Sequence, residues 1–398
     1  MNRIKYPLNI YVVWHPDCKI AKDIAEEIYS TFCRDYKNPL SRGIGVPVYF
    51  RYIKLENNRP LEIDLANAEK NAIVLLIDEE YILDEDFKNY TEELVNKIDD
   101  NNRIFPISLC DKAYSIGCNL SALQFTDGTT FFNKKLDFLK EKHLIKSIKK
   151  IKTELLHDCS RLILNFHPKQ NDKENNRIGS PVKLFLSHAK KDGEITTLRF
   201  KKFIENNLKL DVFFDTVDIA NGYDFAEQFE QEIKHSALVV FHTDEYSNRE
   251  WCRREVLIAK KHKSPIVVVH NVTEGEKRAF PYLGNMPTTV ITGNKDIAFY
   301  KIVNLTLYQV LNNLYQNRLL EFYRDLYKTV SNEIKIITSP PELFNFLDIK
   351  LYKEDLENKK LIILYPDPPL GLEELNILNE LDENVEFTTP INLNYGRK

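Results

Sequence analysis

Residues 248–257, with the sequence NREWCRREVL, place an aromatic ring and a carboxylate where they could act together. Trp251 and Glu255 are four residues apart, so on a helix they lie on the same face. The positions four residues before and after Glu255 hold Trp251 and Ala259, so the helix supplies no cation there. At the wall of a cleft, this carboxylate would act on a ligand whose ring stacks on the indole. An ion pair with a cation elsewhere in the fold is the alternative interpretation, because such pairs are common.

The neighbouring Cys252 raises the question of a thiol nucleophile. Nothing around it in the sequence supplies the basic surroundings that lower a thiol pKa, so we expect a small buried apolar residue instead. The sequence also contains no Walker loop, no GxGxxG dinucleotide fingerprint, no HExxH and no GxSxG. The six cysteines have no CxxC spacing, so we expect no metal site and no disulfide framework.

The elements expected around this helix place it at one edge of a parallel sheet. The runs KLFLSH, LDVFFD, ALVVFHT and PIVVVHNV predict strands buried on both faces, and amphipathic helical segments separate them. In a doubly wound sheet, ligands bind beyond the carboxyl ends of the strands. The helix with Trp251 follows directly from one such end, and the loops after the first two strands open at the same edge.

The same rhythm of strands and helices predicts an α/β protein with two doubly wound parallel-sheet domains of the flavodoxin-like type and a small C-terminal α/β unit. A chain of 398 residues is too long for one ordinary core. We place the first domain at 1–133, a helix and a polar linker at 134–181, the second domain at 182–330 and the C-terminal unit at 331–398.

Composition narrows the class of protein. The net charge of -4 argues against a nucleic-acid partner, since such proteins are usually basic. No apolar run is long enough to cross a membrane, and the N-terminal apolar run is broken by Asn9, which favours a strand over a signal peptide. Together with the scattered cysteines, these features predict a cytoplasmic protein without a membrane partner.

Residues 182 to about 310 resemble a TIR (Toll/interleukin-1 receptor) domain. The first matching box is KLFLSHAKKD, a strand with Phe-x-Ser followed by His. The second is VFFDTVDIANGYDFAEQFEQEIKHSALVVFHTDEYSNREWCRREV, which contains a Phe-x-Asp at a strand end, a Tyr-Ser element and Trp-Cys-x-x-Glu. Several motifs in the family's order make this a specific resemblance over about 130 residues.

The resemblance implies an NAD+-cleaving enzyme that is similar to TIR NADases of bacterial antiviral defence. Enzymatic members of the family break the nicotinamide–ribose bond, and their catalytic glutamate corresponds here to Glu255. The bond breaks through an oxocarbenium-like ribose, so a nearby anion stabilises charge that develops in the transition state. Nicotinamide leaves from a cationic state, so one carboxylate can suffice. NAD+ is then the substrate, and no further cofactor is expected.

The resemblance also implies a set of substrate-binding residues. Trp251 would border the nicotinamide and its ribose, as a surface on which a ring stacks. Ser187, His188 and Lys190 would face the substrate from the loop after the first strand. Phe214 and Asp215 end the second strand, where the family's mobile loop begins. For His188 and Asp215, bracing a loop by hydrogen bonds is an equal alternative.

The first domain is interpreted as a divergent TIR-like domain with a regulatory role. Its segment AIVLLIDEEYILDEDFKNYTEEL is placed like the strand and helix around Glu255 in the second domain. Phe87 stands near the position of Trp251, and Thr91 takes the place of the glutamate, while Glu92 and Glu93 are off register. We therefore expect no NAD+ cleavage in the first domain.

A small-molecule or protein activator could bind the first domain at WHPD, residues 14–17, together with Arg42 and Arg51. The alternative is a packed Trp14 and a turn built on Pro16. The segment YPDPPLG, residues 365–371, predicts a rigid turn after a strand.

Three outputs stay open for the TIR domain. The first is an NAD+ glycohydrolase that self-associates through TIR–TIR contacts when an infection signal arrives. The second is a cyclase that makes a signalling form of ADP-ribose. The third is a scaffold without NAD+ turnover, although the Trp and Glu pair favours an enzyme.

Overall fold

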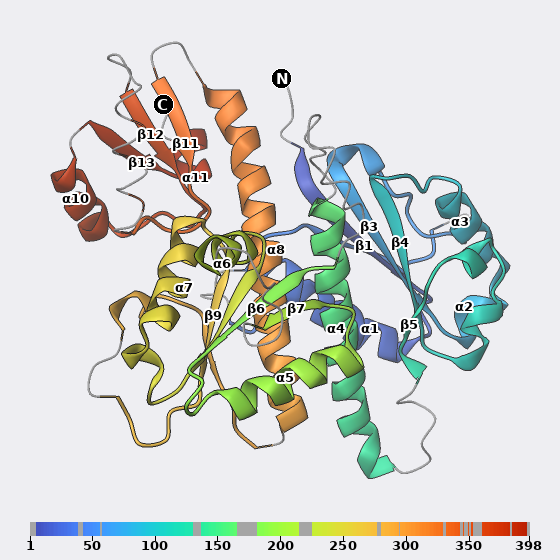
Figure 1. Cartoon of the computed structure of the whole chain (residues 1–398). Helices are drawn as coiled ribbons and strands as arrows, with labels where there is room; N and C mark the ends of the chain where they lie inside the picture. Colours follow the sequence, from blue (N-terminus) through green and yellow to red (C-terminus); the bar gives the residue numbers. More distant parts are fainter. Residues whose placement is uncertain are drawn as a thin grey trace. The chain divides into compact units, whose positions relative to one another are not determined.

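The computed structural model describes residues 5–38, 43–55, 58–129, 137–164, 181–214, 225–276, 280–293, 295–328, 332–342, 345, 349, 352, 360–382 and 384–395. The chain divides into two compact units, Met1–Asp172 and Lys173–Lys398 (Figure 1). The predicted linker lies almost wholly outside the described residues, as do Arg42 and Asp215.

The first unit is built on a five-stranded parallel sheet in the order β2-β1-β3-β4-β5. Its strands are β1 (Tyr6–Trp14), β2 (Val48–Arg51), β3 (Ala68–Ile77), β4 (Asn102–Ser108) and β5 (Thr126–Asp127). The helices are α1 (Lys19–Phe32), α2 (Glu79–Leu83), α3 (Glu85–Val95) and α4 (Asp137–Leu164), and α1 packs against α4. Strands β1 and β3 are buried on both faces over almost their whole length, because helices cover both sides of the sheet.

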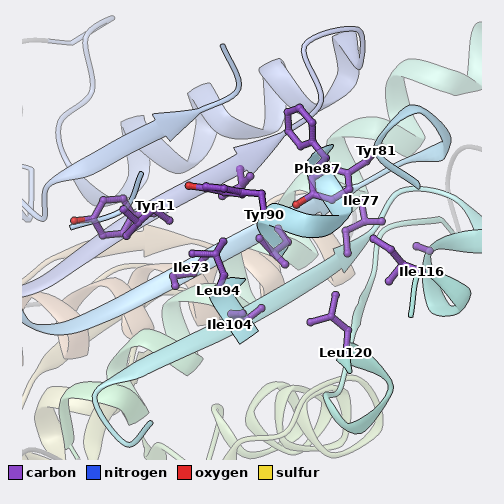
Figure 2. Close-up of a cluster of buried hydrophobic side chains, with 14 residues drawn as sticks. Tyr11, Ile73, Ile77, Tyr81, Phe87, Tyr90, Leu94, Ile104, Ile116 and Leu120 are labelled. Atoms are coloured by element: carbon purple, nitrogen blue, oxygen red, sulfur yellow. The ribbon is translucent and has the colours of Figure 1, made fainter. Parts of the chain in front are cut away.

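One face of this sheet forms a core with α2 and α3. Alternate residues of β3, Ile73, Leu75 and Ile77, point into it, as the two-residue period of a strand requires. Figure 2 shows Tyr81 and Phe87 side by side there, and their ring centroids are 5.1 Å apart.

The second unit contains a five-stranded parallel sheet in the order β10-β9-β8-β6-β7. Its strands are β6 (Lys183–His188), β7 (Asp211–Phe214), β8 (Ala237–His242), β9 (Ile266–His270) and β10 (Thr288–Val290). Helices α6 (Phe225–Lys234) and α7 (Glu250–Lys261) share a core with one face of the sheet. Helices α5 (Glu194–Asn207) and α8 (Lys295–Tyr327) pack against each other, and Phe200 of α5 contacts both Phe241 and Phe299.

The two five-stranded sheets have the same topology. Counted along the chain within each unit, both have the order 2-1-3-4-5, in which the connections change direction between the first and third strands. This arrangement confirms the predicted fold class of two doubly wound α/β domains.

A third, three-stranded parallel sheet in the order β11-β12-β13 forms the predicted small C-terminal unit. Its elements are β11 (Asn332–Ile336), β12 (Lys360–Leu364), α10 (Leu372–Leu381), β13 (Val385–Thr388) and α11 (Pro390–Tyr395). Leu320 near the end of α8 packs into its core with Ile334 and Leu364. Tyr365 of the YPDPPLG turn is fully buried and accepts a hydrogen bond from the Leu370 N–H at 2.9 Å.

Candidate functional site

The candidate site lies at the switch point of the second sheet, beyond the carboxyl ends of β6 and β8. Strand β6 ends in Ser187 and His188, and a short 3-10 turn, η5 (Tyr246–Asn248), follows β8 and leads into α7. Ligands of doubly wound sheets bind at this type of crevice. The fold therefore brings the predicted Ser187, His188 and Glu255 to one edge of one sheet.

Helix α7 begins with Glu250 and ends with Lys260 and Lys261, charges that complement the helix dipole. Cys252, Val256 and Ala259 accompany Glu255 into the core, and the buried Lys260 near the end of the helix forms an ion pair with Glu342 at 2.9 Å. Only 4% of Glu255 is exposed. A carboxylate buried to this degree needs hydrogen-bond donors to remain ionised.

Ser187 and Tyr246 supply a chain of hydroxyl groups that ends on Glu255. The Ser187 hydroxyl donates a hydrogen bond to Oε2 of Glu255. Its oxygen is 2.5 Å from the Tyr246 hydroxyl, which also lies 3.3 Å from the carbonyl oxygen of Cys252. Burial raises the pKa of Tyr246 well above its usual range, and the negative charge of Glu255 raises it further, so this phenol keeps its proton.

Trp251 and Glu255 lie on the same face of α7, with Trp251 on the first turn of the helix. Trp251 is 40% exposed, whereas Glu255 one turn later is buried. The guanidinium carbon of Arg254 is 4.4 Å from the centroid of the indole, a cation–π contact, and Phe229 of α6 approaches the indole at 6.1 Å. An indole held in place and open to solvent provides a surface on which a planar ligand can stack.

His188 and Phe214, the last residues of β6 and β7, pack against each other. Their rings stack with centroids 4.8 Å apart, and both side chains are buried. The His188 carbonyl oxygen accepts a hydrogen bond from the Cys252 thiol at 3.4 Å, which ties α7 to the end of β6. Cys252 is buried, in line with the expectation of a small apolar residue.

The loop after β6 is tied to the turn after β8. Asp192 accepts hydrogen bonds from the Thr243 hydroxyl at 2.7 Å and from the Glu245 N–H at 3.0 Å. Lys191 forms an ion pair with Glu245. The predicted Lys190 is exposed beside it, so of the residues expected in this loop it is the one open to solvent.

The sequence interpretation missed a histidine pair at the same edge, in which His242 is buried and His270 half-buried. His242 and His270 end β8 and β9 as register partners, and their Nδ1 atoms are 3.1 Å apart. Nε2 of His242 is 2.9 Å from Glu276. Burial and the neighbouring His242 lower the pKa of His270. The available signal was a histidine near the end of each of two successive predicted strands, ALVVFHT and PIVVVHNV.

The interpretation named the Tyr-Ser element only as a family motif and gave Tyr246 no role, although this tyrosine follows the end of β8 by four residues. Within the described ranges, no group of three or more His, Cys, Asp or Glu side chains is placed to hold a metal ion. All six cysteines lie in these ranges, and none of them forms a disulfide.

In the first unit, Trp14 is 2% exposed and stacks on Tyr52 with ring centroids 4.4 Å apart. Arg51 lies over the rings of Tyr11 and Tyr49 at 5.3 and 5.9 Å. These contacts correspond to the packed alternative for Trp14 rather than to a pocket wall.

Comparisons with solved structures give weak likenesses. A protein assigned as a phosphosugar isomerase from Clostridium difficile 630 is 8% identical, with a TM-score of 0.21, over 78% of this chain and 85% of that one. A protein assigned as sugar-binding from Salmonella typhimurium LT2 is 11% identical, with a TM-score of 0.21, over 76% and 88%. Neither score supports an argument about this chain.

No curated protein matches the chain in sequence. Among the described residues, no helix combines the length and apolar character needed to cross a membrane. Residues 184–299 match the family model described as TIR domain. This range contains the sheet edge, the hydroxyl chain and helix α7 described above. The second unit of this chain therefore contains a TIR domain at residues 184–299.

Proposed function

We propose that the TIR domain is an NAD+ glycohydrolase in which Glu255 is the catalytic carboxylate. The observation that carries this proposal is a buried carboxylate with a hydroxyl donor, one helical turn inward from an exposed indole, at the switch point of the sheet. A TIR domain used only for protein–protein contact has no need of a charge buried at this position, because burial of a carboxylate costs stability.

In the proposed reaction, the bond between the ribose C1′ and the nicotinamide nitrogen breaks, and its electron pair stays on the nitrogen. Nicotinamide leaves as a neutral molecule, and the ribose becomes oxocarbenium-like. Glu255 stabilises this positive charge, which is absent from the sugar in the ground state. Water then adds to C1′ and releases a proton, which gives ADP-ribose.

Among the predicted site residues that the structure describes, Trp251 and Lys190 are exposed to solvent, so they are the side chains proposed to contact the substrate. Trp251 would stack on the nicotinamide or adenine ring, and Lys190 would meet a phosphate. His188 and Phe214, which are buried, would shape the floor of the site, and Asp215 follows Phe214 directly in the chain.

The regulatory part of the proposal concerns residues 1–133, which would act as a divergent TIR-like regulatory domain. The proposed organisation continues with the helix and linker at 134–181, the catalytic domain at 182–330 and the C-terminal unit at 331–398. TIR domains commonly self-associate, so we propose a cytoplasmic homo-oligomer that acts as an immune effector.

The test is nicotinamide release from NAD+ by the full chain over a concentration series, beside Glu255→Gln and Glu250→Gln. Glu250 is an exposed glutamate on the same helix and serves as the matched control. Release that requires Glu255 but not Glu250, and that rises steeply with concentration, would support a glycohydrolase activated by self-association. Equal release by Glu255→Gln would contradict the proposal. Cyclic products on chromatography would favour the cyclase, and silence at all concentrations would favour the scaffold.

A further inference from the structure

We infer that Ser187 and Tyr246 are positioning residues that fix the orientation and charge of Glu255. This inference rests on the proposed function, in which Ser187 was expected to touch the substrate. Ser187 is 1% exposed, and its hydroxyl points to Oε2 of Glu255. Its contacts therefore place it behind the carboxylate rather than at the substrate.

The protons of the chain can be assigned. Each hydroxyl has one proton, and an ionised Glu255 has none. If Ser187 donates to Glu255, its contact with Tyr246 at 2.5 Å requires the Tyr246 hydroxyl to be the donor. The chain then runs from Tyr246 through Ser187 to the carboxylate. Donation by a hydroxyl group stabilises the charged form of a carboxyl group, so the chain favours the anion that the reaction needs.

The protonated carboxyl group can also be accommodated, through a reversed chain. Glu255 then donates to Ser187, Ser187 donates to Tyr246, and Tyr246 donates to the Cys252 carbonyl oxygen, 3.3 Å away. Every hydroxyl proton has an acceptor in both directions. Protonation of Glu255 therefore reverses the hydrogen bonds without leaving a buried group unsatisfied.

The first unit shows that a helix at this position packs without a carboxylate. There, the Tyr81 hydroxyl is 2.7 Å from the Thr91 hydroxyl, which donates to the Phe87 carbonyl oxygen at 2.8 Å. Both side chains are fully buried. A tyrosine and a hydroxyl residue thus suffice to hold the helix, which leaves the charge on Glu255 for a role other than packing.

The activity test uses Ser187→Ala and Tyr246→Phe with matched controls. Ser160→Ala and Tyr81→Phe each remove a buried hydroxyl bond, 2.7 Å in both cases, in the first unit. For Ser187→Ala we expect kcat to fall at least tenfold with KM changed less, and the acid limb of the pH profile to move to higher pH. Tyr246→Phe should move it in the same direction by less, since Ser187 still donates. Profiles that match those of the controls would overturn the inference.

A second measurement does not depend on NADase activity. Trp14 and Trp251 are the only tryptophans, so in a Trp14→Phe background the fluorescence of Trp251 reports urea unfolding of the second unit. We expect the double variant Ser187→Ala with Glu255→Gln to lower the unfolding midpoint by less than the sum of the two single variants. Additive losses would overturn the chain. Coupling without nicotinamide release by the parent would instead overturn the proposed function and leave the chain standing.

Discussion

The two five-stranded sheets share one topology but differ in the residues at their corresponding edges. In the first unit, Phe87 is fully buried and Thr91 closes a short hydroxyl contact with Tyr81. In the second unit, Trp251 is 40% exposed and Glu255 ends the hydroxyl chain from Tyr246. The scaffold is common to both, so the chemistry depends on the few residues placed on it.

The largest expected difference between the two units concerns Glu255 and Thr91, the residues to which the hydroxyl groups are bonded on α7 and α3. Glu255→Gln should lower kcat about 100- to 1000-fold, because one preorganised stabilising group is lost from the transition state. Thr91→Val keeps the shape at the corresponding position of the first unit and should leave kcat unchanged. Nicotinamide release by the two full-length variants measures both. A comparable loss in Thr91→Val would end the functional distinction between the sheets.

Removing the aromatic residues Phe87 and Trp251 should affect the free energy of unfolding in the reverse order, with the larger loss in the first unit. Phe87→Ala empties a fully buried site and should cost the first unit about 3–5 kcal/mol in free energy of unfolding. Trp251→Ala removes a partly exposed ring and should cost the second unit far less. It should lower kcat/KM about tenfold through lost stacking with the substrate. Urea unfolding followed by hydrogen exchange in each unit, beside steady-state kinetics, separates the two effects. The contrast would be wrong if Trp251→Ala unfolded its unit while Phe87→Ala were tolerated.

An aspartate holds a loop near the edge of the second sheet, whereas Asp84 of the first unit caps α3 through the N–H groups of Asp86 and Phe87. Asp244 accepts bonds from the Thr273 hydroxyl and from the N–H groups of residues 273–275. The Thr273 hydroxyl, followed by these N–H groups, lowers the pKa of Asp244 to about 2.

A lowered carboxyl pKa stabilises the fold above the unfolded value, about 3.8, and this contribution is lost as the pH falls towards 2. Amide exchange at residues 273–275, corrected for its intrinsic pH dependence, should therefore accelerate over that range. In Asp244→Asn it should already be fast at neutral pH. Protection that survives in Asp244→Asn would show that other contacts hold this loop.

The doubly wound fold could be predicted because its strands are long apolar runs and its helices have a clear apolar face. Glu255 and Trp251 could be found because their four-residue spacing acts within one helix. The link from Ser187 to Glu255 spans 68 positions, and no local pattern encodes it. The expectation that Ser187 and His188 face a ligand came from the resemblance to the TIR family and stays a prediction. Ser187 and His188 are buried because α7 and Phe214 pack against them, and the sequence alone does not specify this packing.

The smallest expected effect concerns the histidine pair, which the first sheet lacks. The register partners at the corresponding strand ends of the first unit are Ile77 and Ser108. Burial, followed by the nearby His242, holds the pKa of His270 below its ordinary value of 6.5, although Glu276 opposes this shift. Below pH 6.5 the unfolded chain therefore binds more protons at His270 than the folded chain does, so stability falls with acidification.

Trp251 fluorescence in the Trp14→Phe background can measure this effect as the change in urea midpoint between pH 7.5 and 5.5. His270→Asn should flatten that change, because it removes a group that the fold keeps neutral. The same variant leaves the ring contact between His242 and Tyr246 at 5.8 Å in place, so the midpoint coupling between Ser187 and Glu255 should stay intact. An unchanged acid dependence in His270→Asn would show that His270 does not carry it. The hydroxyl chain would then remain the feature that separates the edges of the two sheets.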